Sequence, residues 1–215
     1  MSRNAERDAI REKERRKRLL ESGLRLFAEK GIEAVKLQEI ADEAQVGIAT
    51  LYNYYQNKVN LVVAISAHMW KRVWDEYRER IGSENLSSFN AYQQAESFFD
   101  LIIDLYHEHP ECLRFSGFFK SYMNIYSDMA DQENEHLNML APIGIHFHDL
   151  YEKAKVDKSI RTDVEEDVMF TTISLTLLGM AERYAQGIVW TGHKDRDYSV
   201  ELQLLKEMML NWLKV

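Results

Sequence analysis

The chain has 215 residues, of which 46% are hydrophobic and 29% are charged, so it has the composition of a globular protein and not of a disordered one. Only two prolines and nine glycines interrupt it, which favours long helices. The single cysteine, Cys112, excludes an internal disulfide and a cysteine-based zinc site, and its apolar neighbours predict a buried filler. No run of about 18 apolar residues and no signal-peptide stretch is present, so we expect a cytoplasmic protein.

Charge is distributed unevenly along the chain, whose net charge is −8. Residues 1–60 carry 12 Lys and Arg against 10 Asp and Glu, whereas the rest carry 15 against 25. Within residues 1–18 the count is 8 basic to 4 acidic. A basic N-terminal segment followed by an acidic remainder suits a protein that binds a polyanion with one end. Ion pairs along a solvated helix would also explain the basic residues.

The apolar periodicity is helical throughout, and no alternating strand pattern occurs, so the predicted fold is all-α. A helix ends at Gly31, a short one surrounds Ile40, and a long one runs from Lys58 to about Arg80. After a loop at 82–88, with Ser87 or Ser88 as helix cap, a helix should end before Pro110. Further helices are expected at about 111–127, 131–155, 163–190 and 197–214.

The stretch from Gln38 to Tyr55 has the pattern of a helix-turn-helix unit. Such a unit needs apolar residues where two short helices cross and a small residue where their backbones approach. Ala41 is that small residue, the turn falls at 45–47, and the second helix spans Ile48 to Tyr54. A helix of this kind places its N-terminal residues at base edges in the major groove. The apolar crossing is formed by Ile40, Ala44, Val46, Leu51 and Tyr54.

The sequence Leu26-Phe27-Ala28-Glu29-Lys30-Gly31, followed by Thr50-Leu51-Tyr52 and by Asn57-Lys58, resembles the N-terminal region of the TetR family of transcriptional regulators over about residues 18–62. The resemblance implies a helix-turn-helix DNA-binding domain at 1–57, with a basic extension in 1–18. It also implies a ligand-binding and dimerisation domain at 58–215. Two positions depart from the family pattern. Gln45 stands where glycine is usual in the turn, and Gly47 stands where a serine-like cap is usual.

The matched motif predicts which residues touch DNA. Glutamine can pair with adenine through two hydrogen bonds, so Gln38 is a candidate base reader, and Lys58 at a helix N-terminus is a candidate phosphate ligand. The alternative for Tyr54 is that its ring packs in the core, and the alternative for Lys58 is that it is a solvated surface lysine. The predicted DNA-binding residues are Lys36, Gln38, Gly47, Ile48, Ala49, Thr50, Tyr52, Asn53, Tyr54 and Lys58.

The last two predicted helices carry more apolar side chains than one subunit can bury. The helix at 163–190 is apolar nearly all round, and the last helix has an apolar stripe, which predicts a four-helix bundle made by two copies of the chain. The alternative is that both helices fold into their own subunit's core. The predicted interface residues are Leu177, Met180, Tyr184, Leu204, Leu205, Met208, Met209 and Trp212.

Aromatic side chains concentrate in the middle of the chain, where large rings leave gaps that can hold an apolar ligand. The family resemblance implies a small-molecule effector there. The predicted pocket residues are Trp70, Trp74, Tyr77, Phe99, Tyr106, Phe118, Phe119, Tyr122, Phe147 and Tyr151, and many of them would also suit a core. The histidine pairs have i,i+2 spacing, which points the two rings to different sides of a helix, so no metal site is expected. No nucleophile elbow, phosphate-binding glycine loop or paired-carboxylate arrangement occurs, so no enzymatic activity and no cofactor are expected.

These features together predict a repressor that is a homodimer, binds a palindromic operator and is released by a small apolar or aromatic effector. The expected partners are double-stranded DNA, a second copy of the chain and that effector, with no membrane. The alternatives are a transcriptional activator with the same fold and a helical protein–protein adaptor that no longer binds DNA.

Overall fold

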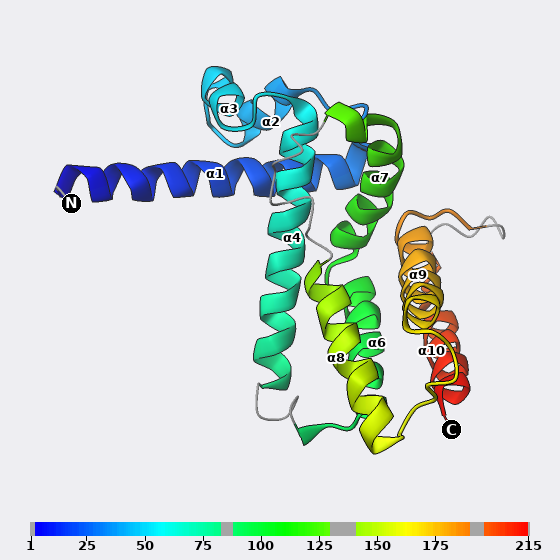
Figure 1. Cartoon of the computed structure of the whole chain (residues 1–215). Helices are drawn as coiled ribbons and strands as arrows, with labels where there is room; N and C mark the ends of the chain where they lie inside the picture. The colour runs from blue at the N-terminus through cyan, green and yellow to red at the C-terminus, as the bar shows by residue number, and fades with distance from the viewer. Residues whose placement is uncertain (1–2, 83–87, 130–140, 190–195, 215) are drawn as a thin grey trace. The chain divides into compact units, whose positions relative to one another are not determined.

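The computed structural model describes residues 3–82, 88–129, 141–189 and 196–214, and every regular element in these ranges is a helix (Figure 1). The predicted all-α class is therefore confirmed. None of the described helices combines the length and the apolar character that crossing a membrane requires.

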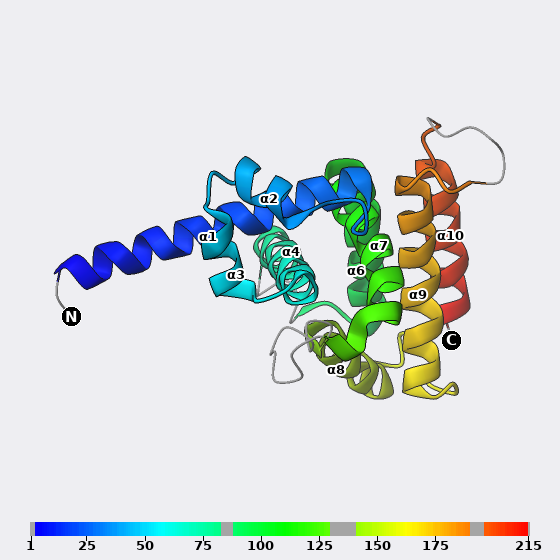
Figure 2. The same cartoon turned by 90° about the horizontal axis from the view of Figure 1, so that it is seen from above.

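Four helices make up the N-terminal part: α1 (Arg3–Lys30), α2 (Leu37–Glu43), α3 (Ile48–Tyr55) and α4 (Lys58–Ile81). The first ends where the sequence predicted, because Gly31 adopts a φ of +82° that favours glycine, and its amide still donates to Phe27 O at 2.9 Å. In both views α1 continues well beyond α2 and α3 toward its N-terminus (Figures 1 and 2).

The remaining helices are α6 (Ala91–Glu108), α7 (Pro110–Tyr126), the short 3₁₀ helix η1 (Ser127–Met129), α8 (Ala141–Asp157), α9 (Glu166–Ala185) and α10 (Ser199–Leu213). As predicted, α6 stops before Pro110. The prediction that Ser87 or Ser88 caps this helix was wrong. The N-cap of α6 is Asn90, whose side chain accepts from Gln93 N at 2.8 Å. Ser88 is not part of this cap, and Ser87 falls outside the described residues. The predicted helix start at residue 131 also falls outside them.

The chain divides into two compact units, and both α4 and α7 contribute to each. The first unit holds residues 1–71 and 118–137, and the second holds 72–117 and 138–215. The domain boundary predicted after residue 57 stays a prediction. In the first unit the core side chains Leu19, Phe27, Ile40, Leu51 and Leu61 are completely buried.

In the second unit α6 packs against α8, α9 and α10. The last two helices lie side by side in both views (Figures 1 and 2). An ion pair between Lys206 Nζ and Asp100 Oδ1, 2.5 Å apart, ties α10 to α6. Cys112 is 2% exposed, as expected of a buried filler, and burial raises the pKa of its thiol to about 11.

Candidate functional site

The helix-turn-helix unit is built on the small and apolar residues that the sequence assigned to it. Ile40 and Ala41 on α2 and Leu51 on α3 are all completely buried, and Val46 N donates to Ala41 O at 2.9 Å across the turn. Because Ala41 has only a methyl side chain, the turn backbone can approach α2 this closely. The second helix begins at the predicted residue, Ile48, and ends at Tyr55, one residue later than predicted.

The turn adopts a conformation that glycine would favour, although its sequence has glutamine there. Gln45 has a φ of +54°, so an L-residue occupies the left-handed region at an energetic cost. Gly47 is the N-cap of α3, with extended backbone angles, and Thr50 N donates to its carbonyl oxygen at 2.9 Å. Both departures from the family pattern therefore lie in the turn that sets the angle of α3.

One face of α3 is buried and the opposite face is open to solvent. Leu51 and Tyr55 point into the core, with exposed fractions of 0% and 7%. Tyr52 is 49% exposed, and Asn53 is also exposed. Of the predicted DNA-binding residues, Lys36, Gln38, Gly47, Ala49, Tyr52 and Asn53 are exposed, whereas Ile48, Thr50, Tyr54 and Lys58 are half-buried.

On α2 the candidate base reader is already engaged within its own helix. Gln38 Nε2 donates to Asp42 Oδ1 at 2.7 Å, so pairing both ends of its amide with adenine would require this bond to break. Lys36, at the start of α2, uses its backbone amide to donate to Glu39 Oε1 at 3.0 Å and leaves its ammonium on an exposed side chain.

Tyr54 is held by two arginines from α1. Arg15 Nε donates to its hydroxyl oxygen at 3.3 Å, and the guanidinium of Arg16 lies 4.1 Å from the centre of its ring. These two cations therefore lie beside α3. Local sequence spacing could not identify them as site residues, because Arg15 is 39 positions from Tyr54 in the chain and Arg16 is its neighbour.

Lys58 is held by the loop that precedes α2. Its ammonium donates to Val35 O at 2.8 Å and to Glu33 O at 3.3 Å. Burial lowers its pKa, and Glu33 and Glu39 oppose this shift. The phosphate contact predicted for Lys58 stays a prediction. A phosphate would have to accept from an N–H of the ammonium that does not already donate to Val35 O or Glu33 O.

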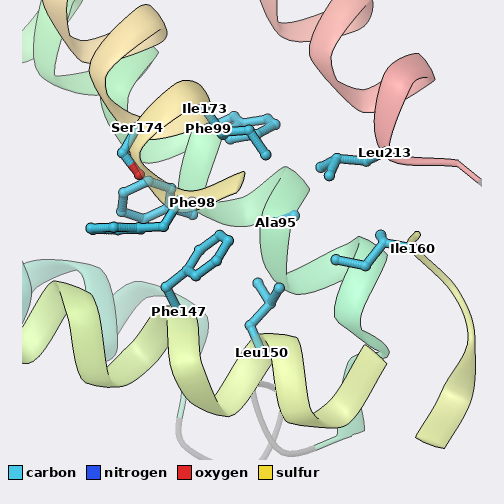
Figure 3. A pocket seen from close by; sticks show the side chains of 10 residues that line it. Ala95, Phe98, Phe99, Phe147, Leu150, Ile160, Ile173, Ser174 and Leu213 are labelled. Carbon is cyan, nitrogen blue, oxygen red and sulfur yellow. The ribbon is translucent and has the colours of Figure 1, made fainter. Parts of the chain in front are cut away.

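The second unit contains a small apolar cavity of about 10 Å³ between α6, α8, α9 and the end of α10 (Figure 3). Of the predicted pocket residues, Phe99 and Phe147 line it. Of the lining side chains that the structure describes, only that of Ser174 is polar. The cavity lining is completed by Ala95, Phe98, Leu150, Ile160, Phe170, Ile173 and Leu213.

The other predicted pocket residues do not line this cavity, because most of them are occupied in packing. Trp74 stacks on Phe98, with ring centres 6.4 Å apart, so it packs against a ring that lines the cavity without lining the cavity itself. The Tyr151 hydroxyl donates to Val164 O at 2.7 Å, and the Tyr106 hydroxyl accepts from Tyr198 N at 3.1 Å. The remainder are buried or half-buried elsewhere: Trp70, Tyr77, Phe118, Phe119 and Tyr122.

The predicted interface residues divide between core and surface. Leu177 and Met209, with exposed fractions of 0% and 9%, are buried within the single chain, and their place at an interface stays a prediction. Leu204, Met208 and Trp212 remain 54%, 68% and 40% exposed on α10. Met180, Tyr184 and Leu205 are half-buried. On α9, Val168 and Leu175, at 49% and 59% exposed, were not predicted as interface residues.

Three side chains in the second unit lie close enough to hold a metal ion: His148, Glu152 and Glu166. The spacing of the histidines does not reveal this group, because Glu166 lies 18 positions beyond His148 in the chain. His148 Nδ1 lies 2.9 Å from Glu166 Oε1, and Lys155 Nζ donates to Glu152 Oε1. His148 and Glu152 are exposed, and exposed acidic groups of this kind are common without a metal ion.

Residues 19–65 match the profile described as bacterial regulatory proteins, tetR family. Over 62 residues the chain is 42% identical to the HTH-type transcriptional repressor KstR of Rhodococcus jostii, a match that covers 29% of each protein. The aligned segment thus spans less than a third of that curated relative.

Two longer matches cover most of the chain. The repressor KstR2 of Rhodococcus jostii is 26% identical over 162 residues, which is 73% of this chain and 72% of the relative. A solved structure titled as the ketosteroid transcriptional regulator KstR2 of Mycobacterium tuberculosis has a TM-score of 0.64. That alignment covers 94% of this chain and 95% of the other at 16% identity, which shows a shared fold.

Proposed function

Because the chain belongs to the TetR family of bacterial regulatory proteins through the match of residues 19–65, we propose that it is a repressor that a small apolar effector releases from a palindromic operator. In this proposal the first unit binds DNA, the second unit binds the effector, and α9 and α10 pair with a second copy of the chain.

The observation that carries the proposal is the two-sided character of α3. Its buried side, Leu51 and Tyr55, fixes the helix on the core, whereas its open side presents Ala49, Tyr52 and Asn53 to solvent. A short helix anchored in this way can enter the major groove, where alanine methyls contact thymine and polar side chains contact base edges. Arg15 and Arg16 place positive charge beside it for the phosphate backbone.

The homodimer rests on the apolar side chains that one chain leaves uncovered. Val168 and Leu175 on α9 and Leu204, Met208 and Trp212 on α10 are between 40% and 68% exposed. Covering them with the same two helices of a second copy would form a two-fold bundle. A symmetric pair of recognition helices then favours a palindromic operator.

The effector class rests on the cavity and on the relatives. Nine of the ten lining side chains are apolar, and four of them are phenylalanines. The structural relative KstR2 of Mycobacterium tuberculosis is a ketosteroid transcriptional regulator, and we infer that an apolar multi-ring molecule also suits this chain. At about 10 Å³ the cavity is too small for an organic molecule, so an effector would have to move its walls apart. In this proposal α9 is both a wall of the cavity and a helix that faces the second copy.

The test is fluorescence anisotropy of the full chain with a labelled duplex taken from upstream of its own gene, and with a scrambled duplex of the same composition. We expect a complex that weakens as salt rises, and a preference for the native duplex of about a thousandfold or more. Tyr52→Ala and Asn53→Ala should reduce this preference. Val156→Ala, an exposed change on α8, away from the proposed DNA-binding and dimer surfaces, is the control. No complex at any salt concentration would contradict the proposal and favour the adaptor alternative.

A further inference from the structure

Ser174 places a hydroxyl group inside the apolar cavity of the second unit. The residue is 7% exposed, and its Oγ has no hydrogen-bond partner among the described residues. Its side chain is directed toward Phe98, into the space that the rings enclose (Figure 3). A buried hydroxyl without a partner destabilises the fold, so its position needs an explanation.

Hydroxyl groups on the same helix behave differently. Thr171 Oγ1 donates to the carbonyl oxygen of Asp167, one turn earlier, at 2.7 Å, and Thr176 Oγ1 donates in the same way to Thr172. This bond is the usual way for a helical serine or threonine to satisfy its hydroxyl. Ser174 does not make it, and its hydroxyl remains available to the cavity.

Water is a poor partner for this hydroxyl. A cavity of about 10 Å³ has room for about one water molecule, but a buried water needs two to four polar partners. Among the described residues that line the cavity, Ser174 alone has a polar side chain, and the other nine are Ala, Phe, Leu and Ile. An apolar molecule that brings its own oxygen would satisfy the hydroxyl and also fill the space.

The rings around Ser174 determine the shape of such a molecule. Phe98 and Phe99 come from α6, Phe147 from α8 and Phe170 from α9, and the last two have ring centres 4.9 Å apart. Flat molecules pack well between aromatic faces. The ligand would have to separate these rings, because a cavity of about 10 Å³ has no room for an organic molecule.

We propose that Ser174 determines effector specificity, and that the cavity takes a flat apolar ring molecule carrying one hydroxyl or carbonyl oxygen, which hydrogen-bonds to Ser174 Oγ. This inference rests on the proposed effector-responsive function and adds the polar group by which the cavity distinguishes its ligand from a plain hydrocarbon. The hydroxyl of serine can donate to a carbonyl oxygen and can also accept from a ligand hydroxyl.

The test compares matched probes on the full chain by ligand-observed NMR titration. 2-Naphthol and 2-methylnaphthalene differ by a hydroxyl in place of a methyl, and 1-tetralone and tetralin differ by a carbonyl oxygen. The measured quantity is the ratio of the two dissociation constants within each pair, in the unaltered protein and in Ser174→Ala. The matched control is Thr176→Val, which removes an exposed hydroxyl from the same helix.

We expect Ser174→Ala to shift the ratio for at least one pair by about tenfold against the oxygen-bearing probe, the effect of one neutral hydrogen bond in a buried site. The hydrocarbon probe should bind as well as before or better, and the pair that shifts identifies a hydroxyl or a carbonyl ligand. Thr176→Val should leave both ratios unchanged.

Two results would overturn the inference: the same ratios in Ser174→Ala as in the unaltered protein, or no binding of any probe. The melting temperature of each variant is measured in parallel, and removing an unpaired hydroxyl should leave it equal or raise it. DNA binding is measured separately on the same preparations. A protein that fails to bind DNA but shows the shift refutes the repressor proposal and leaves the ligand inference standing.

Discussion

The ammonium of Lys58 lies 2.8 Å from the carbonyl oxygen of Val35, so the first residue of α4 is bonded to the loop that leads into α2. A second, longer bond joins it to Glu33 O. Burial at this position lowers the pKa of Lys58. The side chain therefore positions the helix-turn-helix unit on α4, in addition to any phosphate contact that it makes.

Replacing Lys58 with alanine should destabilise the protein, because the loop carbonyls lose a charged donor. We expect a loss of about 1–2 kcal/mol in the free energy of unfolding, measured by urea denaturation. The matched control is Lys36→Ala, which removes an exposed ammonium. It should leave the unfolding free energy unchanged, and if Lys36 contacts phosphate it should flatten the salt dependence of DNA binding by about two units per dimer. Equal stability of Lys58→Ala and the unaltered protein would show that the loop does not need this bond.

Gln45→Gly should stabilise the protein. The turn holds residue 45 at a φ of +54°, and glycine adopts this conformation without the steric penalty that glutamine pays. After allowing for the greater freedom of glycine in the unfolded chain, we expect a gain of about 0.5–1 kcal/mol. Gln38→Gly makes the same exchange at an exposed position inside α2 and should cost about 1 kcal/mol. Changes of the same sign in both variants would contradict the strain argument.

The contact of α1 with α4 can be tested through Gly23. A methyl group added there would overlap Ile65 Cδ1, and Ile65 is completely buried. Gly23→Ala should therefore lower the unfolding free energy by about 1–2 kcal/mol, although alanine favours a helix. Ile65→Val removes the overlapping carbon, so the double variant should be more stable than the two single changes predict by about 1–2 kcal/mol. Strictly additive effects would mean that the two residues do not touch.

Local sequence patterns predicted the helix-turn-helix unit closely, because its start, turn and buried residues follow from apolar spacing and from the small residue Ala41. The structure of the site around it could not be predicted in the same way. The bonds from Arg15 to Tyr54 and from Lys58 to Val35 join residues 39 and 23 positions apart, and no local pattern encodes such pairs.

The cavity was the least predictable feature. Phenylalanines that line it and aromatic residues that fill the core have the same composition and helical spacing, so the sequence could not separate Phe99 from Trp74. Ser174 was missed because one serine on an apolar helix usually bonds to its own backbone. Only the structure shows that it does not.

Met208→Glu should weaken the homodimer, because the side chain is 68% exposed on α10 and lies on the face proposed to pair with a second copy. Burying a carboxylate there without a partner would raise the dissociation constant of the dimer by at least tenfold. Sedimentation velocity at protein concentrations of about 1–10 μM measures the change in the dimer's dissociation constant. Met129→Glu is the control, since Met129 is 61% exposed but lies in η1. If both variants stay as dimeric as the unaltered protein, α10 is not the interface.

Cys112 should make the protein lose stability in mildly alkaline solution. Burial raises the pKa of its thiol from 9.0 to about 11 in the folded protein. Below pH 9 both the folded and the unfolded chain keep this proton, so the thiol contributes no pH dependence there. Between these two values the unfolded chain releases the proton and the folded chain retains it, so stability falls as the pH rises. The slope is at most about 1.4 kcal/mol per pH unit for one proton.

The measurement is urea unfolding of the protein and of Cys112→Ala at pH 8 and pH 10, the second of which lies inside the window set by the thiol. The variant loses packing at both pH values, but it has no thiol to titrate. The stability advantage of the unaltered protein over the variant should therefore shrink by about 1 kcal/mol between the two conditions. Tyr77 and Tyr122, whose pKa values burial raises to about 12, are present in both proteins and cancel from the difference. An advantage that is the same at both pH values would mean that the thiol is not protected from deprotonation in the folded state.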